Sequence, residues 1–234
     1  MSVSAVKDKL QSLANPTIAE HSQRFFKTGK GEYGEGDKFL GIRVPVLRKQ
    51  VKLFRELSLV DVCRVLQSRF HEERLLALLM LVDRFERADE TEQTEIYQLY
   101  LRHTDYINNW DLVDSSALQI VGGYLFERER DSLYELVHSV SLWERRIAII
   151  ATFYMIRRED FSDTLKLSEI LLEDGEDLIH KAVGWMLREV GKRDMGIEQK
   201  FLQKYYKNMP RTMLRYAIEK FPEPLRKQYL AGDI

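Results

Sequence analysis

Apolar residues recur at every third or fourth position along almost the whole 234-residue chain, which is the period of an amphipathic α-helix. Five prolines and 12 glycines leave few of the interruptions that separate short strands. The pattern therefore predicts an all-α protein in which only residues 28–44 form a long loop. We expect helices over residues 2–13, 17–27, 45–55, 58–68, 70–86, 91–103, 109–126, 130–140, 142–158, 162–173, 176–192, 197–208, 211–221 and 223–231.

The longer predicted helices share a second pattern, because in each of them one polar residue precedes an almost unbroken apolar run. These polar residues follow one another at intervals of 32 to 40 residues: Arg74, Asp114, Arg146, Lys181 and Arg215. A shorter helix lies between consecutive members, so the repeating unit is a helix pair, as in chains that stack repeats into a solenoid. Equivalent positions would then line one concave wall with four cations and a single carboxylate. Unrelated amphipathic helices would give a similar pattern, and this alternative stays open.

The charges are distributed unevenly, although the formal net charge of the chain is only −1. Residues 24–55 hold nine Lys or Arg against three acids, residues 56–175 hold 13 against 24, and residues 176–234 hold 12 against eight. Two basic ends around an acidic middle suit a chain that binds a polyanion along one surface. Ordinary exposed charge without a ligand is the alternative interpretation.

The composition sets further bounds on the class of protein. With 44% hydrophobic and 31% charged residues, the chain is expected to form a single globular domain over residues 1–234. The single cysteine, Cys63, excludes an internal disulfide and fits a reducing compartment, so we expect a cytoplasmic protein. The longest apolar run, residues 75–82, is far shorter than the roughly 20 residues of a membrane span, and the N-terminal segment lacks a run of signal-peptide length.

Several motifs can be set aside. Residues 29–34 match the form G-x-G-x-x-G, but no predicted strand precedes them, so they are interpreted as part of the loop. The five histidines never fall at positions i and i+4, and none neighbours the cysteine, so no metal site is expected. Ser115 and Ser116 have no neighbouring base in the sequence that could activate a nucleophile. We therefore expect a function without a metal or a cofactor.

The segment Asn108–Asp114 is the most unusual in the chain. Trp110 and Asp114 are four residues apart and therefore share one face of a helix. Asn109 is a natural N-cap, and Asp111 in the first turn suits the helix dipole, so Asp111 is expected to be structural. Asp114 lies one turn further on and has no such role.

Two interpretations of Asp114 are open at this point: a functional carboxylate, or an ion pair with Arg74 or Arg146 of a neighbouring repeat. Trp185 stands one turn after Lys181 and next to a glycine that would allow a close approach. A buried core position is the alternative for this tryptophan. Two tryptophans and a carboxylate on one wall would favour a cationic ligand.

Four segments resemble the DNA alkylation repair family of HEAT-like-repeat DNA glycosylases, the alkylpurine DNA glycosylase D type. They are FLGIRVPVLRK at 39–49, WDLVD at 110–114, LWERRIAI at 142–149 and KAVGWMLRE at 181–189. The resemblance implies a right-handed solenoid of HEAT-like antiparallel helix pairs with a concave basic groove. It also implies hydrolysis of the N-glycosidic bond of positively charged N3- or N7-alkylated purines, such as 3-methyladenine and 7-methylguanine, in duplex DNA. The expected product is an abasic site, formed by a monomer without a cofactor as a step of base excision repair.

The resemblance also assigns residues. It places the active-site tryptophan at Trp110, the catalytic aspartate at Asp114, the groove arginine at Arg146 and a second tryptophan at Trp185. An aromatic residue near the lesion would match Phe25 or Phe26, and the residues cannot be told apart by sequence. Phosphate or other DNA contacts are expected from Lys181, Arg188, Arg74, Arg215, Arg43, Lys38 and Arg145.

Two other functions compete with the enzyme. One is a non-catalytic helical-repeat module that binds DNA structures or a protein partner, and the other is an inactive DNA-binding relative. The combination of Trp110, Asp114 and Arg146 favours the enzyme, because a scaffold does not need a carboxylate inside a cationic groove. The expected partner is double-stranded DNA carrying alkylated purines, and the expected location is the cytoplasm of a bacterial cell, in association with the nucleoid.

Overall fold

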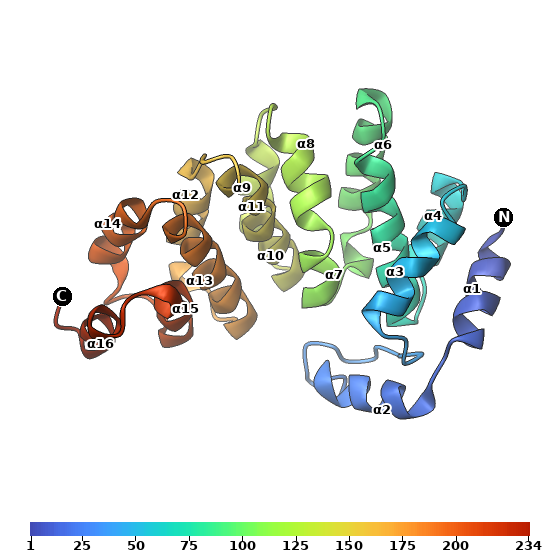
Figure 1. Ribbon diagram of the computed structural model, residues 1–234, viewed down its shortest axis with the longest axis horizontal. Coiled ribbons are helices and arrows are strands. Elements are labelled where there is room, and N and C mark those ends of the chain that lie inside the picture. The colour runs from blue at the N-terminus through green and yellow to red at the C-terminus, as the bar shows by residue number, and fades with distance from the viewer. The chain divides into compact units, whose positions relative to one another are not determined.

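The computed structural model describes residues 1–234, and helices make up its regular structure (Figure 1). The one β feature is an isolated parallel bridge between Lys38 and Phe70. The prediction of an all-α chain built from helix pairs is therefore confirmed. None of the helices combines the length and the apolar run that crossing a bilayer would require. The contacts divide the chain into two compact units, residues 1–120 and 121–234, and the expected single domain stays a prediction.

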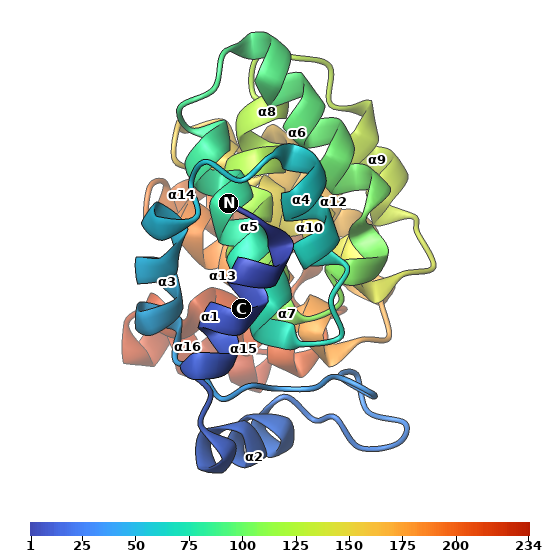
Figure 2. The same cartoon turned by 90° about the vertical axis from the view of Figure 1, so that its right-hand side faces the viewer.

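The first unit is organised around one central helix, α5, which packs against α3, α4, α6 and α7. The apolar run of α5 is buried almost throughout, so this helix forms the core of the unit. Figures 1 and 2 show α2 and the segment after it at one end of the unit. The helices are α1 Val3–Ser12, α2 Pro16–Phe25, α3 Val44–Leu53, α4 Leu59–Leu66, α5 His71–Phe85, α6 Glu90–Arg102, a 3-10 turn Thr104–Tyr106 and α7 Trp110–Asp114.

The second unit is organised in the same way around α13, which packs against α10, α14 and α15. A side chain at Gly184 would collide with the carbonyl oxygen of Met213, so this glycine allows the close approach of α15. The helices are α8 Gly123–Leu125, α9 Asp131–Val137, α10 Leu142–Ala151, α11 Phe153–Ile156, α12 Ser162–Ile170, α13 Asp177–Gly191, α14 Met195–Tyr205, α15 Arg211–Ala217 and α16 Glu223–Ala231, and a π-helical segment Leu118–Gly122 spans the boundary between the units.

Two long predicted helices are interrupted in the structure, so the single helices expected over 109–126 and 142–158 were wrong. The first breaks after α7, where the hydroxyl of Ser116 donates to the carbonyl oxygen four residues earlier at 2.7 Å. The second breaks at Thr152, whose hydroxyl donates to the carbonyl oxygen three residues earlier, also at 2.7 Å. Hydrogen bonds of this kind compete with the helical ladder and bend the chain. The predicted last helix, 223–231, has its bounds confirmed.

Candidate functional site

The short helix α7 carries the residues that the sequence singled out. The side chain of Asn109 caps the helix by accepting from the backbone N–H of Trp110 at 2.8 Å, which confirms the predicted N-cap. Leu112 and Val113 are buried and attach α7 to the core of the first unit. Trp110 and Asp114 are only half-buried, so both are accessible from one side of the helix.

Asp114 is the last residue of α7 and lies near the buried phenol of Tyr100. Burial raises the pKa of Tyr100, and the negative charge of Asp114 raises it further. The open alternative of an ion pair between Asp114 and Arg74 is excluded, because the Arg74 guanidinium binds Asp37 at 2.6 Å and the carbonyl oxygen of Ser68 at 3.1 Å. Asp114 is therefore a half-buried carboxylate that Arg74 does not neutralise.

An aromatic cluster surrounds Trp110 and consists of Phe25, Phe26, Phe39, His71 and Trp110. The ring of Phe26 stacks on Trp110 with centroids 5.4 Å apart, and Phe25 meets Trp110 edge-on at 6.1 Å. The Phe25 side chain nevertheless stays 58% exposed. Both N-terminal aromatic candidates thus lie beside Trp110, and together they present π faces at the surface next to the carboxylate-bearing helix.

The loop before α3 is held in place by the buried carboxylate of Glu72. This side chain accepts from three consecutive backbone N–H groups, those of Leu40 at 2.8 Å, Gly41 at 2.7 Å and Ile42 at 3.1 Å. Gly41 has φ +80°, and a side chain there would collide with the backbone oxygen of Asn15. The predicted loop is therefore confirmed, and its second half is rigidly attached to α5.

His71 joins this loop to α7. Its Nδ1 atom lies 3.1 Å from Asp37 of the loop, and its Nε2 atom lies 2.8 Å from Asp111 of α7. Burial opposes the charged form, but the hydrogen bond to Asp111, its negative charge and the hydrogen bond to Asp37 outweigh burial and raise the His71 pKa to about 9. Burial likewise opposes ionisation of Asp37, yet the bond to His71 and the charge of Arg74 lower the Asp37 pKa. Two cations and two carboxylates thus form one buried cluster.

The stability of the protein should fall as the pH rises through the pKa of His71. The folded pKa of about 9 lies above the ordinary value of 6.5, so the stabilisation is complete below pH 6.5 and is lost on the way to pH 9. A shift of this size sets an upper limit of about 3 kcal/mol. We expect thermal unfolding to show a lower Tm at pH 9 than at pH 6, with a flatter profile for His71→Gln. Equal pH dependence of the variant and the parent protein would contradict this assignment.

The exposed cations of the first unit concentrate on α2, the loop and α3. Two of the expected DNA-contacting residues, Lys38 and Arg43, are exposed and take part in no ion pair. Five more exposed cations of this region are also without an ion pair: Lys27, Lys30, Arg48, Lys49 and Lys52. We call these seven residues the basic surface. None of these seven side chains is engaged in an ion pair, so the basic surface is available to an anionic ligand.

The second unit holds the other candidate residues. Trp185 is half-buried, donates its indole N–H to Glu189 at 3.2 Å and meets Phe153 edge-on at 5.8 Å. Arg146 is 5% exposed and donates to the carbonyl oxygen of Leu178. Lys181 pairs with Asp177 one turn earlier at 2.8 Å, and its side chain is 39% exposed. Arg215 is exposed.

Three arginines that were expected to contact DNA form ion pairs with acids of the protein. Arg74 is only 3% exposed, and its guanidinium is bound to Asp37. Arg145 binds Asp174 at 2.6 Å and also donates to two backbone oxygens. Arg188 is paired with Glu219 on the neighbouring turn before α16. Guanidinium groups engaged in this way join segments of the fold, and their contact with phosphate stays a prediction.

His71, Glu72 and Asp37 were not predicted as site residues, and among the histidines only the spacing of metal ligands was considered. One signal could have found them. The polar residues 71–74 stand at the start of the most apolar helix, and each is at most 4% exposed in the structure. Four consecutive polar residues that enter a core require partners, and such partners indicate a buried network.

Fold and site together define a helical-repeat protein with an aromatic and acidic site next to a basic surface. The model of the family described as DNA alkylation repair enzyme matches residues 6–221, and the chain belongs to this family. A solved structure described as a predicted DNA alkylation repair enzyme from Enterococcus faecalis is similar, with a TM-score of 0.69 and 16% identity over 90% of this chain and 97% of that chain. At this identity, the likeness concerns the fold. A search of curated proteins finds no match. Membership gives the protein a role in the repair of alkylated DNA, with DNA as its partner.

Proposed function

We propose that the protein is a monofunctional DNA glycosylase that hydrolyses the N-glycosidic bond of N3- and N7-alkylated purines in duplex DNA. The observation that carries this proposal is the half-buried carboxylate of Asp114, one helical turn from Trp110, which belongs to an aromatic cluster with Phe25 at the surface. A protein that only bound DNA would have no use for an acid at such a place. The proposal places the activity at the first step of base excision repair.

The chemistry of the substrate explains why one carboxylate suffices. Alkylation at N3 or N7 gives the purine a positive charge, so the base leaves with the electron pair of the C1′–N bond and becomes neutral. The remaining barrier is the positive charge that develops on the deoxyribose, as in glycoside hydrolysis. The carboxylate of Asp114 would stabilise this charge and orient a water molecule, whose oxygen bonds to C1′. The proton of that water passes to the carboxylate and then to solvent, which leaves an abasic site.

The aromatic residues have the complementary role of holding the lesion. Trp110, Phe25 and Phe26 offer faces and edges to the alkylated nucleotide, with cation–π contacts of about 0.5–2 kcal/mol each. From the family resemblance, Trp185 of the second unit is proposed as a further contact to DNA. Arg146 is likewise proposed from the family resemblance as the groove arginine, and in the protein it is buried and donates to the carbonyl oxygen of Leu178.

Removing charge from the basic surface should weaken DNA binding in a salt-dependent manner. Each phosphate contact contributes about 0.9 to the slope of log K against log salt concentration. We expect Lys38→Ala/Arg43→Ala to reduce this slope by about 2, as measured by fluorescence anisotropy with a duplex. Lys7→Ala/Lys166→Ala removes two exposed cations from outside the basic surface and should leave the slope unchanged. The same slope in both double variants would argue against the basic surface as the DNA contact.

The test of the proposed function is the analysis of released bases. Duplex DNA treated with dimethyl sulfate is incubated with the protein, and the soluble fraction is separated by chromatography, with a parallel incubation without protein to correct for spontaneous loss. The proposal predicts 3-methyladenine and 7-methylguanine in solution and abasic sites without strand breaks in the DNA. A module without catalytic activity would bind the duplex and release no base.

We also propose that the protein acts as a monomer in the cytoplasm, on the nucleoid DNA of a bacterial cell. The free thiol of Cys63 supports a reducing compartment. Light scattering of the purified protein, free and with a short duplex, tests the monomeric state.

A further inference from the structure

We propose that His71 is a positioning residue for α7. As an imidazolium between Asp37 and Asp111, it fixes the short helix that carries Trp110 and Asp114. The effect on base excision rests on the proposed function. The effect on the position of α7 does not, and the two effects can be measured separately.

The geometry alone requires a charged ring. Both ring nitrogens of His71 lie within hydrogen-bond distance of carboxylate oxygens, at 3.1 Å from Asp37 and 2.8 Å from Asp111. An ionised carboxylate only accepts, and a neutral imidazole has a single N–H to donate. Both contacts are hydrogen bonds only when the ring carries two N–H groups. Asp37 is in turn fixed by Arg74 at 2.6 Å, so the anchor on the side of the loop is itself held.

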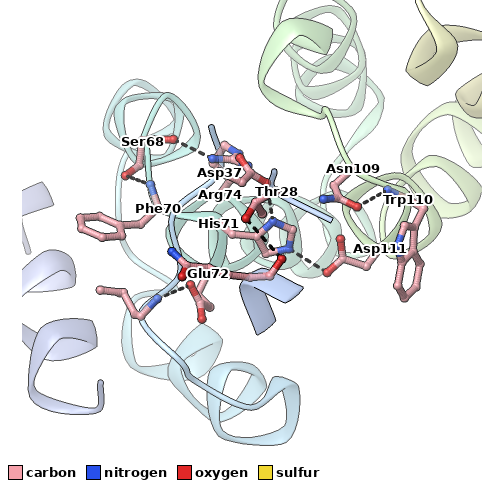
Figure 3. Close-up of polar contacts among 12 residues, drawn as sticks. Thr28, Asp37, Ser68, Phe70, His71, Glu72, Arg74, Asn109, Trp110 and Asp111 are labelled. Atoms are coloured by element: carbon pink, nitrogen blue, oxygen red, sulfur yellow. Dashed lines mark hydrogen bonds and ion pairs between the residues drawn. The ribbon is translucent and has the colours of Figure 1, made fainter. Parts of the chain in front are cut away.

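The helix α7 depends on this anchor because it is short. It has five residues, and the chain turns away at Ser115, so few helical hydrogen bonds hold it. Asp111 links α7 to α5 by a single contact, from one carboxylate oxygen to His71. Its other oxygen is buried without a partner. Figure 3 shows Asp111 pointing back to His71 while the ring of Trp110 lies beyond it. A loss of the imidazolium charge would therefore weaken the attachment of α7 to α5.

The aromatic cluster provides a second set of contacts between His71 and Trp110. The ring of His71 stacks on Phe39 with centroids 4.6 Å apart and lies 5.0 Å from Phe26. Phe26 stacks on Trp110. Any movement of the imidazolium thus reaches the indole through Asp111 on one side and through Phe26 on the other.

The charged groups around His71 determine the pH at which it loses its proton. Asp37 faces it from the loop, Asp111 from α7, and Arg74 from its own helix. A cavity of about 570 Å³ borders it on the side of α2 and α3, and besides Asp111 the titratable or charged residues of that cavity are His21, Arg43 and Glu72. Glu72 is occupied by three backbone N–H groups. His21 is exposed and forms no ion pair or side-chain hydrogen bond, which makes it a matched control.

The fluorescence of Trp110 tests the positioning without DNA. Replacing the other two tryptophans, in Trp143→Phe/Trp185→Phe, leaves Trp110 as the only indole. We expect its emission to change with a midpoint near pH 9 as His71 loses its proton, and we expect this transition to disappear in His71→Gln. His21→Gln should keep the transition, and tyrosine ionisation contributes equally to all three proteins. A transition that persists in His71→Gln would overturn the proposal.

Single-turnover excision from a methylated duplex tests the consequence for activity. His71→Gln and Asp111→Asn should each lower the rate constant on the order of 10- to 100-fold, because a small displacement of Asp114 removes its alignment, and the Kd for the duplex should change little. The double variant should be no worse than the poorer single variant, because both lose one shared contact. Additive losses would overturn the proposal.

Asp111→Asn removes the negative charge that holds the His71 imidazolium and keeps the size of the side chain, so it provides the same test if His71→Gln does not fold. If the parent protein releases no base at all, the proposed function fails, and the fluorescence of Trp110 still decides whether His71 positions α7.

Discussion

Asp114→Asn should lower the rate of 7-methylguanine excision on the order of 100-fold or more, with nearly unchanged affinity for DNA. Asparagine has the shape of aspartate without its charge, so the variant loses the electrostatic stabilisation of the developing sugar cation. The loss of one preorganised electrostatic group costs about 2.7–4 kcal/mol of transition-state stabilisation. Single-turnover rates on a methylated duplex, measured beside the Kd for the same duplex, separate catalysis from binding.

A matched control uses Asp105, an exposed acid in the turn before α7. Asp105→Asn removes the same charge at a nearby position and should leave the excision rate unchanged. If Asp114→Asn and the parent protein excise 7-methylguanine equally fast, Asp114 has no part in the reaction. A parallel loss of binding and excision would instead indicate that Asp114 supports the fold of the site.

Glu72→Ala should have the largest effect on stability. The substitution leaves three buried backbone N–H groups without an acceptor, those of Leu40, Gly41 and Ile42. Each unsatisfied group costs about 1–3 kcal/mol, and partial relaxation of the loop reduces the sum, so we expect a loss of about 3–5 kcal/mol in the free energy of unfolding. Denaturation with urea, monitored by circular dichroism, measures this value.

The comparison variant is Glu86→Ala, an exposed glutamate at the end of the same helix. It should change the free energy of unfolding by less than about 0.5 kcal/mol. Glu72→Gln keeps one accepting oxygen and should fall between the two. A loss of less than about 1 kcal/mol in Glu72→Ala would show that the loop finds other acceptors, and its attachment to α5 would have to be reconsidered.

The helical class and most helix bounds could be predicted because the apolar period is a local property of the sequence. The last helix, 223–231, is an example, and its start coincides with Glu223 after a proline. The breaks at Ser116 and Thr152 could not be predicted in this way. Each break depends on a side-chain hydroxyl that donates to a backbone oxygen of the preceding turn. The apolar pattern does not indicate which rotamer a serine or threonine adopts.

The candidate site was predictable in part for the same reason. Trp110, Asp114 and the cap at Asn109 follow from spacing and local helix chemistry, which the sequence contains directly. The ion pairs of Arg74 and Arg145 could not be predicted because their partners lie far along the chain, 37 and 29 residues away. A cation that looks free in the sequence is neutralised by an acid that only the fold brings next to it.

The central claim is that Asp114 stabilises positive charge on the sugar, and one binding measurement tests it without turnover. The probes are two duplexes that differ only at the abasic position: a pyrrolidine analogue with a charged ring nitrogen, and a neutral tetrahydrofuran analogue. We predict that the parent protein binds the charged analogue on the order of 10-fold more tightly, a difference of about 1.4 kcal/mol, and that Asp114→Asn binds both equally. The same preference in the parent and the variant would contradict the account.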